Sequence, residues 1–296
     1  MMYIPALLLA PLLFGIIGKT KALVAGRKGA PFLQPYWDIM KLIQKGAVYS
    51  KTTSLIFRIS PVLGFAATLT CFLLLPIPGY RALLSFPGDF LALVLLLGVA
   101  RFSMVLAALD TGSSFEGMGA SREVFYSFLA EPTLLLTFLV LLFSRSGSSL
   151  AEVLTFTSYQ EPGSWVTLAL VSLSIFIVLL AENARIPFDD PNTHLELTMI
   201  HEVMVLDTSG PDFAFVTYTA ALKLWIFGTV WLGITFPFSR GLPWLDLSLY
   251  LLGMVLFAFL IGIIESILAR VRLLHTSHPL TLATVLSALA LLWTIG

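Results

Sequence analysis

The sequence predicts an all-α fold, an integral membrane bundle of eight transmembrane helices with an amphipathic cytoplasmic helix after the first of them. Of the 296 residues, 58% are hydrophobic and only 11% are charged, whereas a soluble domain carries about 25% charged residues. Apolar runs of about 20 residues, the length that crosses the hydrocarbon core of a bilayer, recur along the chain. No alternation of apolar and polar residues appears, which argues against a transmembrane β-barrel. We therefore expect a single transmembrane domain over residues 1–296.

Eight apolar runs are the expected spans. They cover residues 3–25, 55–77, 87–109, 122–143, 163–181, 213–236, 246–268 and 279–295. The first run is interpreted as a retained helix and not as a cleaved signal peptide, because no basic region precedes it and no cleavage site follows it.

Lysine and arginine predict the orientation of the spans. The connections after the first, third, fifth and seventh spans, with the adjoining helix ends, hold twelve of the 17 Lys and Arg residues, and the opposite side holds three. By the positive-inside rule, the richer side faces the cytoplasm. Both termini are then expected outside.

The first cytoplasmic connection, about 26–54, is expected to contain a short amphipathic helix. Its apolar stripe consists of Phe32, Leu33, Tyr36, Trp37, Met40, Leu42 and Ile43. Trp and Tyr are typical anchors of a helix that lies in the membrane interface. The helix is also a candidate docking surface for a peripheral subunit, and the two interpretations are compatible. The cytoplasmic residues assigned to docking are Gln34, Asp38, Lys41, Arg122, Arg270 and Arg272.

Two further cytoplasmic connections are rich in polar residues. In the second, between Asp110 and Glu123, Gly and Ser permit tight turns. The third, residues 182–210, places nine of the 38 charged or His residues in 29 positions. They are Glu182, Arg185, Asp189, Asp190, His194, Glu196, His201, Glu202 and Asp207.

The third connection is expected to contain its own helix. Pro187 and Pro191 interrupt helical structure, and Asn192 or Thr193 is placed to cap a helix that runs to about Leu206. On that helix Glu202 shares a face with apolar residues, a setting that raises the pKa of a carboxyl group.

Four ionisable residues, Arg101, Glu131, Lys223 and Glu265, fall within the expected spans. An ionised side chain at the bilayer centre costs at least about 2.5 kcal/mol. These residues are therefore either ion pairs that only stabilise the bundle or stations of a proton or ion path. The first three lie two to three turns from the cytoplasmic ends of their spans, so we expect them to share one depth and one internal polar cavity. Glu265 lies near the inner end of its span and joins the cytoplasmic set.

The sequence predicts neither a metal site nor a redox centre in this chain. The single cysteine, Cys71, cannot by itself ligate an iron–sulfur cluster. His194 and His201 are seven positions apart, about 10.5 Å along a helix, which is too far for easy joint coordination. No histidine lies in the middle of a span, which excludes a haem between spans, and the net charge of zero gives no nucleic-acid footprint.

Five ordered stretches resemble one known family. The chain resembles the H-type membrane subunit of respiratory complex I and the corresponding membrane subunits of energy-converting, formate-hydrogenlyase-type nickel–iron hydrogenases. The stretches are residues 29–42, 109–113, 119–123 with Glu131-Pro132, 182–189 and 265–272. After Asp189, complex I members continue with regularly spaced glutamates, whereas residues 190–202 of this chain look like the hydrogenase-4 type.

The resemblance implies a role and a set of partners. The implied partners are hydrogenase large and small subunits on the cytoplasmic face, an iron–sulfur electron-transfer subunit, antiporter-like membrane subunits at the side, and the lipid bilayer. The nickel–iron centre and the iron–sulfur clusters are expected in those partners, with no cofactor in this chain. The implied location is a prokaryotic cytoplasmic (inner) membrane.

The leading hypothesis is a non-catalytic subunit that anchors a redox arm and couples electron transfer to proton or sodium translocation. The residues assigned to the coupling path are Glu182, Arg185, Asp189, Asp190, His194, Glu196, His201, Glu202, Glu131, Arg101, Lys223, Asp110, Glu123 and Glu265. The alternatives are a passive anchor, a quinone-binding subunit of the complex I type and a free-standing transporter. The quinone alternative predicts a long cavity under the first and third cytoplasmic connections. The transporter lacks the inverted repeat that such folds show.

Overall fold

The computed structural model describes residues 3–80, 82–145, 147–154, 164–189, 199–236, 242–268 and 275–295. Eight helices within these ranges are long and apolar enough to cross a membrane, which confirms the predicted fold class. They are α1 (Tyr3–Val24), α3 (Leu55–Leu74), α4 (Asp89–Asp110), α5 (Ser114–Arg145), α7 (Ser164–Glu182), α8 (Gly210–Thr235), α9 (Pro243–Ile267) and α10 (Ser277–Ile295). The shorter elements are α2 (Gln34–Ile43), α6 (Leu150–Val153) and the 3₁₀ helix η1 (Glu202–Val205).

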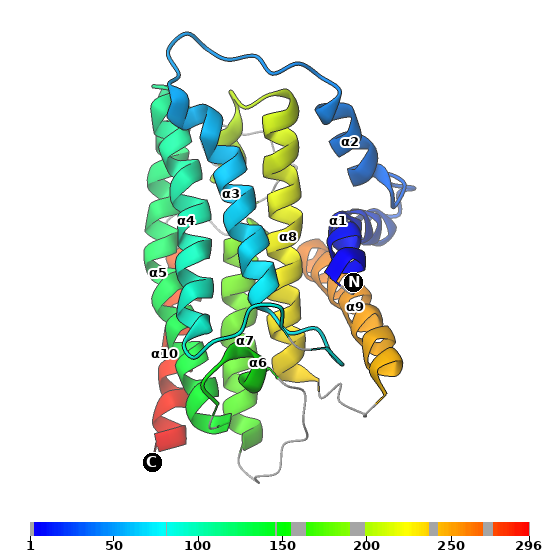
Figure 1. Ribbon diagram of the computed structural model, residues 1–296, viewed down its shortest axis with the longest axis vertical. Coiled ribbons are helices and arrows are strands. Elements are labelled where there is room, and N and C mark those ends of the chain that lie inside the picture. Colours follow the sequence, from blue (N-terminus) through cyan, green and yellow to red (C-terminus); the bar gives the residue numbers. More distant parts are fainter. Residues whose placement is uncertain are drawn as a thin grey trace.

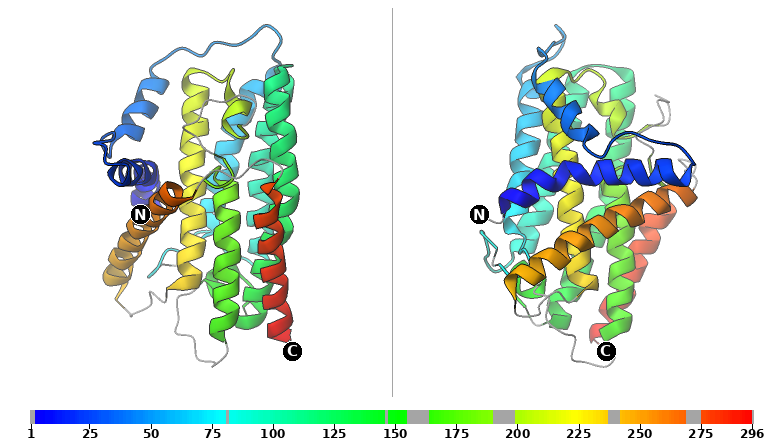
Figure 2. Two further views of the ribbon diagram at one scale, coloured as in Figure 1. Left: turned by 180° about the vertical axis from the view of Figure 1, so that it is seen from behind. Right: turned by 90° about the vertical axis from the view of Figure 1, so that its right-hand side faces the viewer.

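Six of the long helices stand roughly along the long axis of the molecule, whereas α1 and α9 lie across it on one side (Figures 1 and 2). Within the upright group, α3 packs against α4 and α8, and α10 packs against α5 and α7. The two oblique helices pack against each other, and α1 also contacts α8.

The predicted amphipathic helix is confirmed as α2. None of its residues is buried, and Pro35 occupies a first-turn position where a missing amide hydrogen costs nothing. Trp37, Met40 and Ile43 are exposed. One side of α2 contacts α1 and α8, where the Tyr36 hydroxyl donates to the Leu8 carbonyl oxygen. The exposed apolar side chains on its other side suit a helix that lies in the membrane interface.

The start of α5 corrects the sequence prediction. The expected span began at residue 122, but the helix begins at Ser114 and runs for 32 residues. Gly112, with φ of 72°, makes the turn after α4. Gly119, predicted to permit a turn, instead lies inside α5. The position requires glycine because a side chain there would have no room. A Cβ atom at Gly119 would lie 2.2 Å from Cγ1 of Val203 and 2.9 Å from the Ile200 carbonyl oxygen. The glycine therefore lets the third connection pack directly on α5.

The helix expected to end near Leu206 is also corrected. Residues 199–201 are irregular and η1 is a single 3₁₀ turn, so the apolar helical face predicted around Glu202 is absent from the described part of the connection. The physical reason lies in the side chains that hold the backbone here. Asp189 accepts hydrogen bonds from the amides of Ile200 and His201, at 2.9 and 3.2 Å. These bonds fix residues 200 and 201 against Asp189 and stop a regular helix from passing through them.

Candidate functional site: a buried ion-pair network

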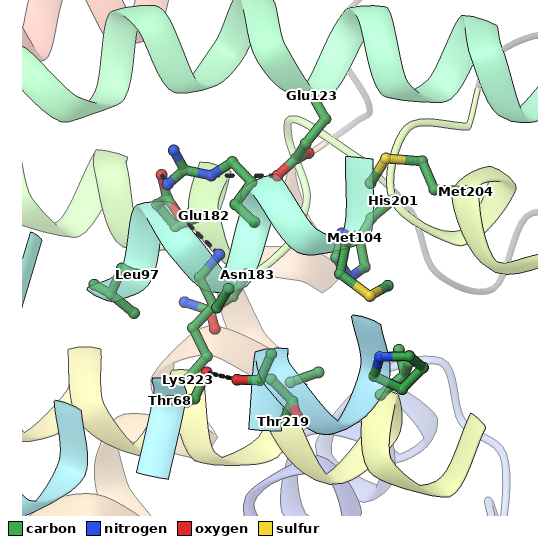
Figure 3. Close-up of a pocket in the computed structure, with 16 residues that line it drawn as sticks. Thr68, Leu97, Met104, Glu123, Glu182, Asn183, His201, Met204, Thr219 and Lys223 are labelled. Carbon is green, nitrogen blue, oxygen red and sulfur yellow. Dashed lines mark hydrogen bonds and ion pairs between the residues drawn. The ribbon is translucent and has the colours of Figure 1, made fainter. Parts of the chain in front are cut away.

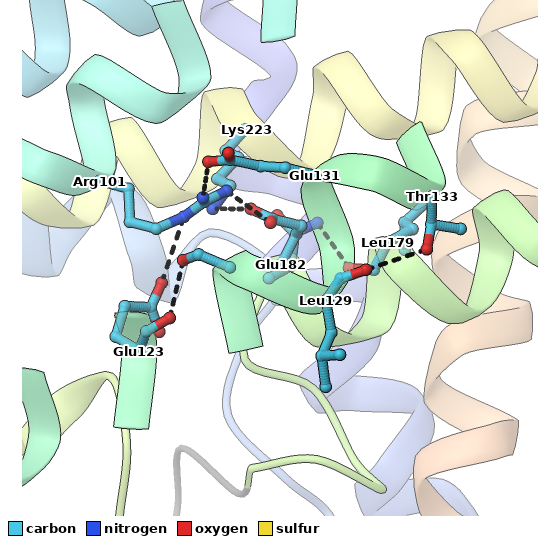
Figure 4. A network of polar contacts seen from close by, with 10 residues as sticks. Arg101, Glu123, Leu129, Glu131, Thr133, Leu179, Glu182 and Lys223 are labelled. Atoms are coloured by element: carbon cyan, nitrogen blue, oxygen red, sulfur yellow. Dashed lines mark hydrogen bonds and ion pairs between the residues drawn. The ribbon is translucent and has the colours of Figure 1, made fainter. Parts of the chain in front are cut away.

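Arg101 of α4 is the centre of a network of buried charges. Its Nη1 lies 2.6 Å from Glu131 Oε1, and its Nη2 lies 2.5 Å from Glu182 Oε1. Its Nε lies 3.6 Å from Glu123 Oε1. One guanidinium group thus joins carboxylates from two places on α5 to the last residue of α7 (Figure 4). Arginine suits this role because its planar group carries several donors in fixed directions.

Lys223 of α8 completes the network. Its Nζ lies 2.7 Å from Glu182 Oε2, so the two oxygens of Glu182 face two different cations. The side chains of Glu182, Arg101 and Lys223 are only 3%, 7% and 14% exposed. Three carboxylates and two cations leave a formal charge of −1. A buried group of this kind is stable only while each charge keeps its partner.

Three of the four charges predicted within the spans, Arg101, Glu131 and Lys223, come together in one network as expected. Only Arg101 and Lys223 of the three line the cavity described next, so the expectation of one shared cavity is wrong for Glu131. Glu131 and Lys223, on different helices, connect through Arg101 and Glu182. The sequence placed Glu182 in a cytoplasmic connection. It lies instead at the end of α7, because α7 stops within the bundle and the polar connection continues beside the other helices (Figure 2).

A small cavity of about 60 Å³ opens on the network from α3, α8 and the third connection (Figure 3). Its polar lining includes Thr68, Asn183, His201 and Thr219 beside Glu182 and Lys223. The rest of its lining is mostly apolar. A cavity of this size has room for a few water molecules beside its polar groups, and water there can carry protons between side chains that do not touch.

A second buried cluster surrounds Glu265 of α9. Lys21 Nζ lies 2.9 Å from Oε2, and Arg185 Nη1 lies 3.3 Å from Oε1. The Glu265 side chain is fully buried. The Arg185 guanidinium group also covers the ring of Phe14, at 4.7 Å from its centroid. The cluster therefore ties the two oblique helices to the start of the third connection.

A larger cavity of about 630 Å³ adjoins this second cluster. Its charged lining comes from α1, α2, α9 and the third connection, with one lysine just after α2: Lys21, Asp38, Lys41, Lys45, Arg185, Glu202 and Glu265. His201 and Asn183 line both cavities, so they stand between the two buried clusters.

The third connection is fixed to α5 by side chains that accept from or donate to its backbone. Besides the bonds to Asp189, the Arg122 guanidinium donates to the Met199 carbonyl oxygen at 2.8 Å, and Glu116 accepts from the Asp207 amide at 3.0 Å.

Burial lowers the pKa of His201 from its ordinary value of 6.5, so the imidazole is neutral at pH 7.

Two residues with predicted roles make hydrogen bonds within this chain. Arg122, assigned to docking of a partner, donates to the Met199 carbonyl oxygen. Asp110, assigned to the coupling path, accepts from the Ser54 amide at 2.6 Å, next to the Ser54 side chain that caps α3. Gln34 and Asp38 are hydrogen-bonded to each other on exposed α2, where Lys41 is also exposed. Asp190, His194, Glu196, Arg270 and Arg272 lie outside the described residues.

The sequence did not predict Lys21 and Phe14 as members of the second cluster, or Glu116 as a contact of the third connection. Lys21 was counted only among the Lys and Arg residues that predict the orientation. Its position in the last turn of the first span was a signal that it could pair with a carboxylate of another span. Phe14 carries no signal in a run of apolar residues. Glu116 was recognised only as a polar residue of a turn, because the extension of α5 was not foreseen. Within the described residues, no group of three or more His, Cys, Asp or Glu side chains is placed to hold a metal ion.

The helices and the site define a class: multi-pass membrane proteins with charge networks buried at the meeting of spans and polar connections. The chain belongs to the NADH dehydrogenase family, whose sequence model matches residues 1–295. It is 33% identical over 297 aligned positions to hydrogenase-4 component C of Escherichia coli (strain K12), covering 98% of this chain and 93% of that protein. It is 31% identical to formate hydrogenlyase subunit 4 of the same organism, covering 89% and 87% of the two chains.

Complex I proteins and a solved structure are also similar. NADH-ubiquinone oxidoreductase chain 1 of Didelphis virginiana is 26% identical, with 86% of this chain and 81% of that protein covered. A chain of the membrane-bound sulfane sulfur reductase, an archaeal respiratory membrane complex, has the same fold. Its TM-score is 0.85 at 20% identity, covering 99% of this chain and 97% of that chain. The resemblance to the complex I membrane subunit and to the membrane subunits of hydrogenases is therefore confirmed.

Proposed function

We propose that this chain is a non-catalytic membrane subunit of a membrane-bound hydrogenase complex. It anchors the cytoplasmic redox arm and couples electron transfer to translocation of protons or sodium ions. The names of two relatives, hydrogenase-4 component C and formate hydrogenlyase subunit 4, support the hydrogenase assignment. The observation that carries the coupling role is the Arg101–Glu182–Lys223 network, which lies inside the bundle and continues into the third connection.

The network suits coupling because one carboxylate, that of Glu182, contacts two cations. When Glu182 takes up a proton, Lys223 loses its carboxylate and Arg101 loses one of its three, so both cations favour a different arrangement. Arg101 turns toward Glu123 and Glu131, which lie within 3.6 and 2.6 Å of it already. A change of charge at the third connection is thereby passed sideways to α5, with the small cavity supplying water for proton transfer.

The partners follow from the same assignment. Hydrogenase large and small subunits and an iron–sulfur electron-transfer subunit would dock on the side that carries α2 and the third connection. Those partners would carry the nickel–iron centre and the iron–sulfur clusters. The Lys and Arg residues of the first connection support the placement of this side in the cytoplasm and of both termini outside.

The test is Glu182→Gln in inverted membrane vesicles, with hydrogen evolution and proton uptake measured separately. We expect hydrogen evolution within twofold of wild type and proton uptake at least tenfold lower. Asp89→Asn is the matched control, because Asp89 is also a buried acid in a span but accepts from the Leu150 amide, away from the network. If both activities of Glu182→Gln persist unchanged, the coupling role is wrong. If the redox arm instead leaves the membrane, the chain is a passive anchor.

The cavity of about 630 Å³ favours one second candidate, a quinone-binding subunit of the complex I type. It lies under the first and third connections, where that alternative predicted a cavity. Phe14, Ile17 and Phe213 give it apolar surface beside its charged groups. Quinone reduction by the purified complex, blocked by quinone-site inhibitors, would support this candidate. Hydrogen evolution that is insensitive to quinone and inhibitor would exclude it.

A further inference from the structure

Glu131 differs from the other members of the buried network in its exposure. Its side chain is 42% exposed, against 13% or less for the carboxylates of Glu123 and Glu182. Glu131 lies 14 residues before the end of α5 at Arg145, which is about 21 Å along a helix and therefore deep in the hydrocarbon layer. A partly exposed carboxylate at this depth faces either lipid or protein.

The surface around Glu131 has the features of a contact between transmembrane helices. On α5, Phe128 and Leu135 flank Glu131 at positions that share its helical face, and they are 74% and 36% exposed. On α4, Leu95 and Phe102 are exposed on either side of Gly98. A Cβ atom at Gly98 would lie 3.6 Å from Glu131 Oε1, so Gly98 lies directly beside the carboxylate. We call these six residues the Glu131 face.

The backbone of α5 offers a second acceptor near Glu131. Pro132 has no amide hydrogen, so it cannot donate to the carbonyl of Phe128 one turn earlier in α5. Lipid tails offer no donor to an acceptor freed in this way. In membrane proteins such groups are satisfied by neighbouring helices, and small residues allow the close approach that this requires.

The charge of the network identifies the chemistry of the partner. Arg101 and Lys223 supply two positive charges against Glu123, Glu131 and Glu182, which leaves the network one negative charge in excess. Glu131 is the member that reaches the surface. We propose that a transmembrane helix of a second membrane subunit packs on the Glu131 face and presents a hydrogen-bond donor or a cation to Glu131. This inference rests on the proposed membership of a multi-subunit membrane complex but not on the coupling role.

The experiment is photo-cross-linking in the complete complex in native membranes, with p-benzoylphenylalanine in place of Phe128. The matched control carries the same group in place of Phe259, which is 45% exposed on α9. We expect an adduct at position 128 with a second membrane polypeptide, in an apolar segment with a donor side chain within one turn of the cross-link. Glu131→Leu lowers the yield of that adduct at least fivefold, Glu131→Gln lowers it less than twofold, and neither changes the products at position 259.

Three results would overturn the inference: adducts at position 128 with lipid only, a cross-linked segment without a donor, or a yield that Glu131→Leu leaves unchanged. Any of these, found together with normal coupling, would remove the interface and leave the proposed function standing. Loss of coupling in Glu182→Gln with the adduct at position 128 intact would support both.

Discussion

Arg101 Nη2 and Glu182 Oε1 lie 2.5 Å apart although the two residues are 81 positions apart in the chain. This contact joins the middle of α4 to the end of α7. It also decides where the third connection starts, because Glu182 is the last residue of a helix that stops inside the bundle. The stability and the proposed function of the molecule both depend on this pair.

Arg101→Met is expected to destabilise the fold strongly. The substitution removes the arginine that faces the buried carboxylates of Glu182 and Glu123. Breaking a buried ion pair by removing one partner costs about 3–5 kcal/mol. The double variant Arg101→Met/Glu182→Leu is expected to recover less than half of that loss, because it leaves Lys223 without its carboxylate and Glu123 and Glu131 without their arginine. Thermal unfolding in lipid nanodiscs measures both. Equal unfolding temperatures for wild type and Arg101→Met would contradict the burial argument.

Substitutions at Glu265 and Lys21 are expected to differ in severity. Glu265→Leu leaves both Lys21 and Arg185 without their carboxylate, whereas Lys21→Met leaves Glu265 paired with Arg185 at 3.3 Å. The first substitution should therefore lower the unfolding temperature by at least twice as much as the second. Lys19→Met is the control, because the Lys19 amine donates to an exposed backbone carbonyl oxygen, that of Lys28, at 2.5 Å. The reverse order of severity would show that Lys21 is the main partner.

Gly119→Ala is expected to destabilise the contact between α5 and the third connection. The new Cβ would meet Val203 and the Ile200 backbone, and overpacking of this kind costs about 1–3 kcal/mol. Gly117→Ala is the matched control on the same helix, since a Cβ there has no atom within 4 Å. It should stabilise by roughly 0.5–1 kcal/mol because alanine favours a helix over glycine. Equal effects of the two substitutions would contradict the packing at Gly119.

His201 is expected to make stability depend on pH. Burial, together with the charge of Lys223, outweighs the nearby carboxylates and lowers the pKa of its imidazole in the folded state below the ordinary 6.5. As the pH falls below 6.5 the unfolded chain binds a proton that the folded protein does not, so the free energy of unfolding decreases. His201→Gln removes this loss. The unfolding temperature of that variant should fall less than that of wild type between pH 7 and 5.5, and parallel curves would contradict the assignment.

The sequence was sufficient to predict the spans and the family but not the contacts of the third connection. Hydropathy identified all eight spans because lipid selects for continuous apolar runs. The proximity of Arg101, Glu131 and Lys223 also followed from counting turns. The extension of α5 to Ser114 was missed because Gly and Ser residues in its first turns resemble those of a loop, and only the packing of Val203 explains Gly119. The same holds for Asp189, whose hydrogen bonds replace the expected helix.

Lys223 offers the most direct test of the coupling role. Its removal leaves Glu182 paired with Arg101 at 2.5 Å, so the complex should still assemble. The measurement is the number of protons translocated for each hydrogen molecule evolved, in vesicles with wild-type, Lys223→Arg or Lys223→Met complexes. We predict that Lys223→Met lowers this ratio at least fivefold while hydrogen evolution stays within twofold, and that Lys223→Arg retains at least half of the ratio. A ratio in Lys223→Met equal to that of wild type would contradict the coupling role of the network.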